Sequence, residues 1–376
     1  MDETGCKNNI ACIPLFALAA LQKLQEAPVS TVTVHRQAAS IAAPHARVST
    51  PDDLDALYAL ACSGGSGLTN LPPDRGALAM KLAASARALT DPAAREAGAA
   101  ILLIIEQAGE IAGTSCIFPR VGAEWPFYSY RLTRQANRSR AVNRLKAQTL
   151  LNLANDFDGE AEVGGLFINP AFRGAALGAL AARARYLFIA QHRAWFRRRV
   201  IAELRGYQDA DGRSPVWDAI GRHFYDMEFH EADRTGAVQG NQFIADLGPR
   251  YPLYVSLLPP AAQAALGRPH DDGRPALEML LAEGFADGDY VDIFDGGPTL
   301  HADIDQLRTV RDARALTVAA ILAGGTPHLV ATGTGASFRV ARGAVTPATT
   351  ADAAIDPALA DTLALAPGDP ILAVPA

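Results

Sequence analysis

Cysteine is scarce in this sequence. The chain of 376 residues holds four cysteines, and no two of them lie at the spacing of a zinc-ligand pair: Cys6, Cys12, Cys62 and Cys116. A chain of this length can build its own hydrophobic core and does not depend on disulfides. We therefore expect a protein of the reducing cytoplasm, without a metal site.

Long apolar runs are also missing. The longest one near the start, residues 10–21, is interrupted by Pro14 and is shorter than the ~20 residues that span a bilayer. No convincing small-x-small cleavage site, of the kind that ends a signal peptide, follows it. The sequence therefore predicts neither a membrane anchor nor secretion.

The sequence has no excess of positive charge. Lys and Arg number 34 against 40 Asp and Glu, so the formal net charge is −6. A nucleic-acid-binding protein needs a basic face to offset phosphate charge, and this balance argues against such a partner. A small anionic ligand is still compatible with it, because local amides and arginines decide that binding.

The character of the sequence changes twice along the chain. Residues 1–45 show no sustained period, and we expect them to form a poorly ordered extension. Between residues 46 and 305, helical and strand patterns alternate, which predicts an α+β region built on a mixed sheet flanked by helices. Residues 306–376 consist of short β-rich pieces separated by Gly and Pro, which predicts a small all-β, barrel-like domain.

Three local patterns predict individual elements. A helix is expected over about residues 74–89, and two apolar strands joined at Ala108-Gly109 predict a hairpin. A strand is expected over about residues 161–168, with Gly164-Gly165 in its middle. Because glycine weakens a strand, this pair indicates a bulge or a close approach of another backbone.

The loop after that strand is rich in small residues, with the sequence RGAALGA from Arg173 to Ala179. The free amides and the dipole at the start of the following helix favour a pyrophosphate. The loop lacks the three-glycine dinucleotide fingerprint, and no P-loop lysine follows. Its spacing resembles the coenzyme A loop of GNAT-like acyltransferases, with Arg173, Gly174, Ala176 and Gly178 at the matching positions. Close packing of a helix against a sheet is the alternative explanation for these small residues.

Several long stretches carry a more specific resemblance. They include SGGSGLTNLPPDR, VIAELRGYQDADGRSPVWDAIGRHFYDMEF, FIADLGPRYPLYVSLLP and YVDIFDGGPTL. Together they are similar to the arginine N-succinyltransferase family, and the resemblance runs from about Arg47 to the C-terminus. It implies tandem GNAT-like halves within residues 46–305, with a boundary near 200–215, and a small C-terminal β-domain.

The resemblance also implies a reaction. Succinyl-CoA would be the donor and the α-amino group of L-arginine the acceptor, in arginine breakdown, without a bound cofactor. A homo-oligomer or a pair with a related subunit is expected. Two alternatives stay open: an N-acyltransferase that uses ornithine or another amine or acyl-CoA, and a catalytically weak partner subunit that binds coenzyme A.

The resemblance places functional roles on three residues. His270, in Gly267-Arg268-Pro269-His270, matches the family's proton donor. An imidazole that titrates near neutrality suits such a transfer. Leu166 matches the family's succinyl-CoA contact. Because a leucine side chain has no polar group, its backbone amide would make this contact. Glu162 matches a family glutamate and is a candidate base, although a strand carboxylate that faces solvent or pairs with an arginine is equally expected.

Residues 133–179 depart from the family pattern. A histidine is replaced by Phe157 and a serine by Ala161, which puts the exact substrates in doubt. A basic run is present instead: Arg131, Arg134, Arg138, Arg140, Arg144 and Lys146. Arginine forks bind carboxylates and phosphates well, but a solvated helix face is the more common role of such a run. Possible carboxylate partners for a substrate guanidinium are Asp156, Asp158, Glu160 and Asp295.

Overall fold

A computed structural model describes residues 43–63, 71–172, 176–229, 231–232, 235 and 242–376. Its largest feature is an eleven-stranded sheet, in the order β10-β7-β6-β3-β2-β1-β13-β12-β15-β11-β14. The strands of its first half are β1 (His45–Val48), β2 (Ile101–Gln107), β3 (Glu110–Phe118), β6 (Ala161–Ile168), β7 (Arg199–Glu203) and β10 (Thr299–Asp303). The predicted α+β class is confirmed.

Strand β2 lies inside this sheet and explains its layering. Its first five residues, Ile101–Ile105 (ILLII), are buried because both faces of the strand are covered. Leu102 and Ile104 pack with helices α1 (Leu54–Ser63) and α2 (Arg75–Thr90) on one face. Leu103 and Ile105 pack with α4 (Leu177–Gln191) on the other face. Successive side chains of a strand point to opposite faces, so one apolar strand supplies both layers of the core.

The predicted hairpin and helix start are both present. Strands β2 and β3 are joined at Ala108 and Gly109, whose φ values of 53° and 79° suit a two-residue hairpin turn. Helix α2 begins at Arg75 after Asp74, whose carboxylate accepts a hydrogen bond from Ala77 N at 2.6 Å. That bond satisfies one of the amides left free at a helix start.

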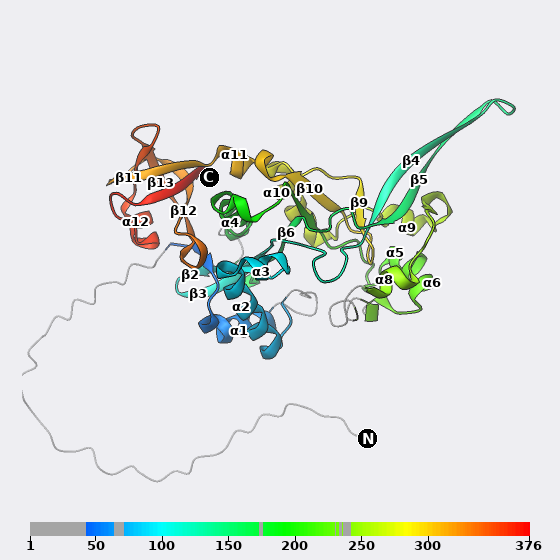
Figure 1. The fold of residues 1–376 in the computed structure, drawn as a ribbon, viewed down its shortest axis with the longest axis horizontal. Coiled ribbons are helices and arrows are strands. Elements are labelled where there is room, and N and C mark those ends of the chain that lie inside the picture. The colour runs from blue at the N-terminus through cyan, green and yellow to red at the C-terminus, as the bar shows by residue number, and fades with distance from the viewer. Residues whose placement is uncertain (1–42, 64–70, 173–175, 230, 233–234, 236–241) are drawn as a thin grey trace, which may run out of the picture. The chain divides into compact units, whose positions relative to one another are not determined.

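A second sheet has four strands in the order β8-β5-β4-β9. Strands β4 (Ser129–Ser139) and β5 (Arg144–Ala154) pair along their whole length, and β9 (Tyr290–Asp292) and β8 (Leu253–Tyr254) flank only their bases. Figure 1 shows β4 and β5 extending away from the rest as a long hairpin. The basic run of residues 131–146 therefore lies on a β-hairpin, and the expectation of a helix face for it is wrong.

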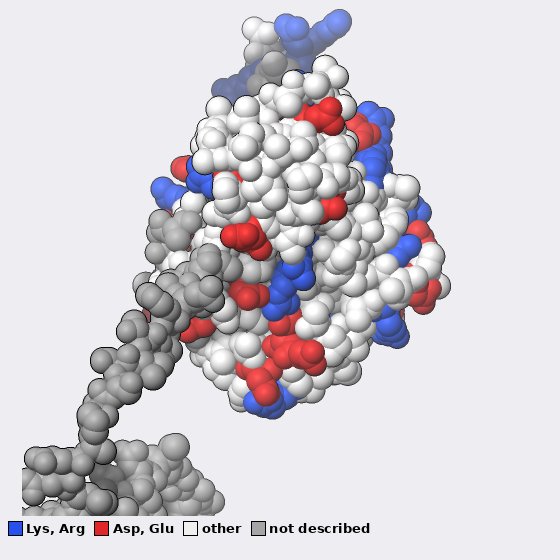
Figure 2. All heavy atoms as spheres, turned by 90° about the vertical axis from the view of Figure 1, so that its left-hand side faces the viewer, with Lys and Arg blue, Asp and Glu red and all other residues white. Residues whose placement is uncertain are grey.

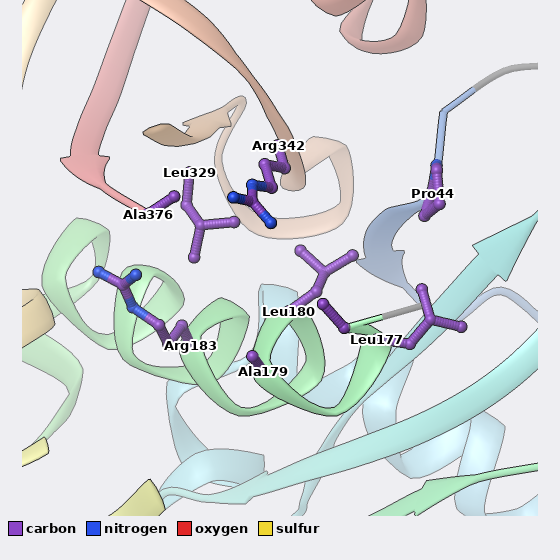
Figure 3. Close-up of a pocket in the computed structure, with 9 residues that line it drawn as sticks. Pro44, Leu177, Ala179, Leu180, Arg183, Leu329, Arg342 and Ala376 are labelled. Carbon is purple, nitrogen blue, oxygen red and sulfur yellow. The ribbon is translucent and has the colours of Figure 1, made fainter. Parts of the chain in front are cut away.

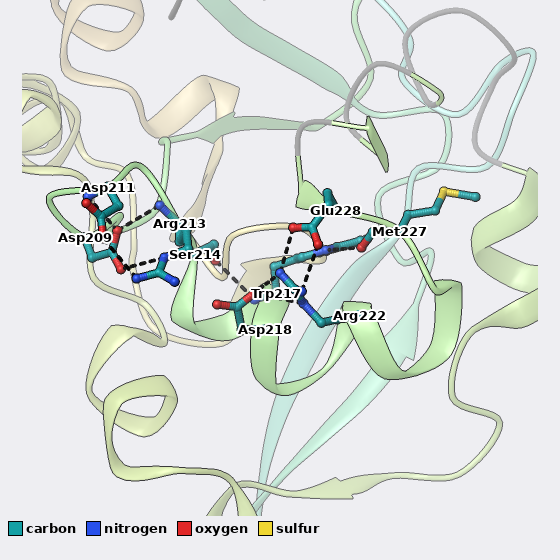
Figure 4. Close-up of polar contacts among 9 residues, drawn as sticks. All are labelled: Asp209, Asp211, Arg213, Ser214, Trp217, Asp218, Arg222, Met227 and Glu228. Carbon is teal, nitrogen blue, oxygen red and sulfur yellow. Dashed lines mark hydrogen bonds and ion pairs between the residues drawn. The ribbon is translucent and has the colours of Figure 1, made fainter.

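The segment between β7 and β9 contains helices α5 (Pro215–Ala219) and α6 (Gly221–Tyr225), whose polar groups are closely paired (Figure 4). Ser214 Oγ accepts a hydrogen bond from Trp217 N at 3.1 Å, and Trp217 Nε1 donates to the Met227 carbonyl at 3.0 Å. Arg222 bonds both Asp218 (2.9 Å) and Glu228 (2.7 Å). These contacts fold one of the family-like stretches onto its own core.

The C-terminal part closes into a five-stranded barrel. Its strands are β11 (Arg314–Ile321), β12 (Thr326–Thr332), β13 (Arg339–Pro347), β14 (Asp352–Ile355) and β15 (Pro370–Pro375). They follow the order β13-β12-β15-β11-β14, and pairing of β13 with β14 closes the ring. The predicted barrel-like form is confirmed. Helix α12 (Pro357–Leu363) packs against it, and β1 links β13 to the rest of the large sheet.

Within the part of the chain that the structure describes, no helix is both long enough and apolar enough to span a membrane.

Candidate active site

Strand β6 is bulged at the two glycines that the sequence singles out. Cys116 of β3 faces Gly164, and Thr114 faces Phe167, so Gly165 and Leu166 together lie opposite a single residue. Gly165 has a φ of 56°, and a Cβ on it would lie 2.8 Å from Cys116 Sγ. Only glycine fits both conditions, and of the two predicted alternatives the bulge is confirmed.

Beyond this bulge, β6 and β7 separate. These parallel strands pair only at Ala161↔Val200 and Glu162↔Ile201. Strand β6 then continues to Ile168 against β3, and β7 continues to Glu203 against β10. Within the described residues, the edge of β6 that faces β7 therefore has no strand partner after Glu162. Such an edge presents free backbone groups to any extended ligand that enters between the strands.

Glu162 lies at the last paired position of β6, where the two strands part. Its carboxylate makes no hydrogen bond or ion pair with any described residue and is half-buried. Burial raises the pKa of Glu162 to about 7, although the positive charge of Arg185 opposes this shift. A carboxylate with that pKa exchanges protons at neutral pH.

Arg185 comes from α4 and is buried beneath β6. Its guanidinium lies 3.4 Å from the Gly164 carbonyl and 3.3 Å from that of Ala182. Burial lowers the pKa of Arg185. Since its charge also acts on Glu162, α4 supplies a fixed positive charge behind the bulge.

Two further acidic residues lie on the β7 side of the opening. Glu203 ends β7 and accepts one hydrogen bond, from Thr299 Oγ1 of β10 at 2.9 Å. Burial raises the pKa of Glu203 well above its ordinary value, and the charges of Asp292 and Glu162 raise it further. Burial also raises the pKa of Asp292, as does the neighbouring Asp295. Because like charges in a desolvated site repel, these carboxylates favour the protonated form.

His270 is held near the end of β7. Its backbone N–H donates to the Arg205 carbonyl at 2.7 Å, and Arg205 follows β7 by two residues. Its ring Nδ1 accepts a hydrogen bond from Asp272 N at 3.2 Å and lies 3.7 Å from an Asp272 carboxylate oxygen. Because Asp272 engages Nδ1, Nε2 is the nitrogen left to exchange a proton with a ligand.

The predicted coenzyme A loop is described only in part. Arg173 and Gly174 lie outside the described residues. Ala176 precedes α4 with a φ of 57° and no side-chain cap, and a Cβ on Gly178 would meet no atom within 4 Å. Leu166 lies in the bulge of β6 and is half-buried.

A cavity of about 310 Å3 lies beside the first turns of α4, between this helix and the barrel (Figure 3). Its lining is mostly apolar, but Arg183 and Arg342 contribute two guanidiniums. Arg183 donates to Thr309 Oγ1 at 3.0 Å and to the Pro375 carbonyl at 2.8 Å. Arg342 makes no ion pair with the described residues. The positive charge in this cavity suits an anionic group.

The sequence-named carboxylates are already engaged by the protein. Asp156 bonds Arg131 and Tyr290, Asp158 bonds Phe127 N and Asn155, Glu160 bonds Arg199, and Asp295 bonds Gly206 N and Gly297 N. Sequence reasoning missed Glu203, Asp292 and Arg185. A carboxylate in the otherwise apolar VIAEL strand was the one local signal for this set. Of the basic run, only Arg131 has a carboxylate partner among the described residues, and the other five cations lie along the hairpin.

The chain matches known families over most of its length. The family described as arginine N-succinyltransferase beta subunit matches residues 45–309, and the C-terminal domain of that subunit matches residues 309–375. A Pseudomonas aeruginosa protein named arginine N-succinyltransferase subunit beta is 40% identical over 281 residues, which cover 75% of this chain and 82% of the relative. An arginine N-succinyltransferase of Yersinia pestis is 40% identical over 272 residues, or 71% of this chain and 76% of the relative.

A solved structure is similar along nearly its whole length. The arginine/ornithine succinyltransferase subunit AI from Pseudomonas aeruginosa superposes with a TM-score of 0.78 at 30% identity. The match covers 89% of this chain and 99% of that one.

Proposed function

The chain belongs to the arginine N-succinyltransferase beta subunit family, and from this we propose that it transfers the succinyl group of succinyl-CoA to the α-amino group of L-arginine. The amine nitrogen forms a bond to the thioester carbonyl carbon, and the carbon–sulfur bond then breaks. The amine loses a proton, the departing thiolate gains one, and the products are N-succinylarginine and free coenzyme A. The bulged β6 that parts from β7 at Glu162 is the observation that carries this proposal.

The acyl donor is proposed to lie along the unpaired edge of β6. Backbone amides there hydrogen-bond the pantetheine arm, and the amide of Leu166 polarises the thioester carbonyl, as an oxyanion donor does. The start of α4 receives the pyrophosphate, with Arg173, Gly174, Ala176 and Gly178 as the contact residues. Arg342 and the neighbouring cavity provide a place for the remaining phosphate.

Glu162 is proposed as the base. Amino acids bring their α-nitrogen as an ammonium, which must lose a proton before it attacks. A carboxylate with a pKa of about 7 accepts that proton, directly or through one water, far better than one with an ordinary pKa. The lack of another partner for Glu162 among the described residues supports this role.

His270 is proposed as the proton donor. Its position near the end of β7 and the engagement of Nδ1 by Asp272 leave Nε2 to protonate the thiolate as the carbon–sulfur bond breaks. Glu203, with Asp292 behind it, is proposed to hold the positive charge of the acceptor. A bound cation would relieve the repulsion that raises the pKa values of both residues.

A second acceptor is also proposed, because the similar Pseudomonas structure is named for both arginine and ornithine. Ornithine carries an ammonium in place of the guanidinium, and a carboxylate binds either group. The name "beta subunit" of the family also leads us to propose that this chain pairs with another subunit. We place the reaction in the cytoplasm, where acyl-CoA is made and used.

Thiol release from succinyl-CoA tests this function. We expect arginine-dependent release by the wild-type protein, and a fall of about 10²–10⁴-fold in His270→Ala with unchanged binding of coenzyme A. Arg268→Ala is the matched control, because it removes a neighbouring side chain that stacks on Tyr207. If ornithine supports thiol release and arginine does not, the acceptor is ornithine and the proposed mechanism is unchanged. Coenzyme A binding without release for any amine would contradict the proposal and favour a non-catalytic partner subunit.

A further inference from the structure

The outer part of the hairpin of β4 and β5 projects beyond the strands that flank its base. We call residues 132–149 of this hairpin the arm. Its two strands pair from Ser129↔Ala154 to Ser139↔Arg144, whereas β9 reaches only to Arg131 and β8 begins at Leu150. No described strand lies against either edge between these points. A two-stranded ribbon is marginally stable by itself in water, so a surface that receives the arm would stabilise it.

The arm carries charge of one sign only. Arg134, Arg138, Arg140, Arg144 and Lys146 are cationic, and residues 132–149 contain no acidic residue. None of these five side chains forms an ion pair with the described residues. The whole chain has a net charge of −6 and the arm contributes +5, so the rest of the chain carries −11. We call the rest of the chain the body. The arm and the body therefore carry net charges of opposite sign.

The exposed surface of the arm has two faces. Every residue from Arg134 to Ala147 is exposed. The register places Arg138 beside Leu145 and Ala136 beside Ala147 on one face, which combines apolar and cationic groups. Leu145 is 70% exposed, and Val142 at the turn is 64% exposed. Apolar side chains set among guanidiniums are typical of a protein interface.

We propose that the arm binds the acidic body of a second copy of this chain. A body with a charge of −11 would repel nucleic-acid phosphates, which makes RNA or DNA the poorer partner for these cations. The same negative charge attracts the arm of another copy. Figure 2, seen from the barrel side, shows acidic and basic side chains interspersed on the near face and basic ones at the projecting top. The exposed Leu145 and Val142 add apolar contact at the end of the arm.

Analytical ultracentrifugation of the full chain tests the proposal. We expect the wild type to associate at about 50 mM salt and to dissociate at about 500 mM, where screening is strong. The double reversal Arg138→Glu with Arg144→Glu should be monomeric at both salt concentrations. Arg87→Glu with Arg314→Glu is the matched control, because it changes the net charge equally at two exposed arginines outside the arm. This control should associate like the wild type.

A second variant removes the arm without disturbing its base. Replacing residues 134–149 by Asn-Gly keeps the Thr133↔Leu150 pair and closes the hairpin with a two-residue turn. It should be monomeric with an unchanged melting temperature. The proposal is overturned if the wild type is monomeric at low salt, or if either arm variant associates like the control. Tight, salt-dependent binding of a fluorescent RNA or DNA oligonucleotide that the arm variants lose would instead assign the arm to nucleic acid.

Discussion

The segment of residues 207–229 and the opening between β6 and β7 are both rich in polar groups, but they differ in how these groups are paired. In the segment, Ser214 caps α5, Trp217 donates to a carbonyl, and Arg222 bonds two carboxylates (Figure 4). At the opening, Glu162 has no partner among the described residues, and Glu203 has one hydrogen bond. A buried polar group without a partner costs free energy. The poorly paired carboxylates at the opening therefore lower the stability of the fold.

The segment makes the family recognisable from sequence, whereas the residues at the opening are the ones that we propose for catalysis. The stretch with the sequence GYQDADGRSPVWDAIGRHFYDMEF stands out because its residues satisfy one another locally. Glu162 and Glu203 stand out only after folding, because their effect depends on burial and on carboxylates far away in the sequence. Changes in the segment should therefore alter stability, and changes at the opening should alter catalysis. Three substitutions sharpen or break this contrast.

The largest effect on stability is expected for Trp217→Ala. Trp217 is 1% exposed, stacks on Tyr225 and Phe294 at ring distances of 5.5 and 5.7 Å, and donates to the Met227 carbonyl. Its loss should lower the free energy of unfolding by about 3–5 kcal/mol, measured by urea denaturation. Trp125→Ala is the matched control at a 41% exposed tryptophan and should have little effect. If the folded Trp217→Ala variant also loses kcat, and the loss expressed as a free energy equals its loss of stability, the contrast does not hold.

The next effect concerns catalysis, in Glu162→Gln. The variant keeps the shape of the side chain but cannot accept a proton, so kcat/KM should fall about 10²-fold. In the wild type kcat/KM should rise with pH through about 7, the pKa of Glu162, and this rise should vanish in the variant. Glu160→Gln is the control, because that carboxylate is held by Arg199. A pH profile that Glu162→Gln leaves unchanged would remove Glu162 from the mechanism.

The same substitution should raise stability. The pKa of Glu162 is about 7 in the folded chain against an ordinary value of 4.5. Between these pH values the folded chain keeps a proton that the unfolded chain has released, so the free energy of unfolding falls as pH rises. Glutamine carries no such penalty. Glu162→Gln should therefore melt at a higher temperature than the wild type at about pH 8, and this advantage should shrink as the pH is lowered toward 4.5.

Local features were predictable from the sequence, and long-range ones were not. The helix expected over about residues 74–89, the Ala108-Gly109 hairpin and the Gly164-Gly165 bulge each depend on a few neighbouring residues, and all three are present. The basic run was wrongly expected to lie on a helix. Its first half pairs with its second half across a turn, as β4 with β5, and sequence periodicity does not reveal such pairing. Glu203 and Asp292 come together through β10, almost a hundred residues away from β7. The boundary near 200–215 between two halves stays a prediction, and residues on both sides of it pair within one sheet.

The smallest effect is expected for Ser214→Ala. Its hydroxyl accepts the Trp217 N–H at 3.1 Å, and loss of a helix cap costs about 1 kcal/mol. The buried amide of Trp217 would then lack a partner, so the whole segment should unfold at lower urea concentration while kcat stays at the wild-type value. Ser139→Ala, at an exposed position of the arm, is the control. If Ser214→Ala lowers kcat and leaves the unfolding midpoint unchanged, the segment takes part in catalysis. The division between a segment with paired polar groups that supports the fold and an opening with unpaired ones that supports catalysis then does not hold.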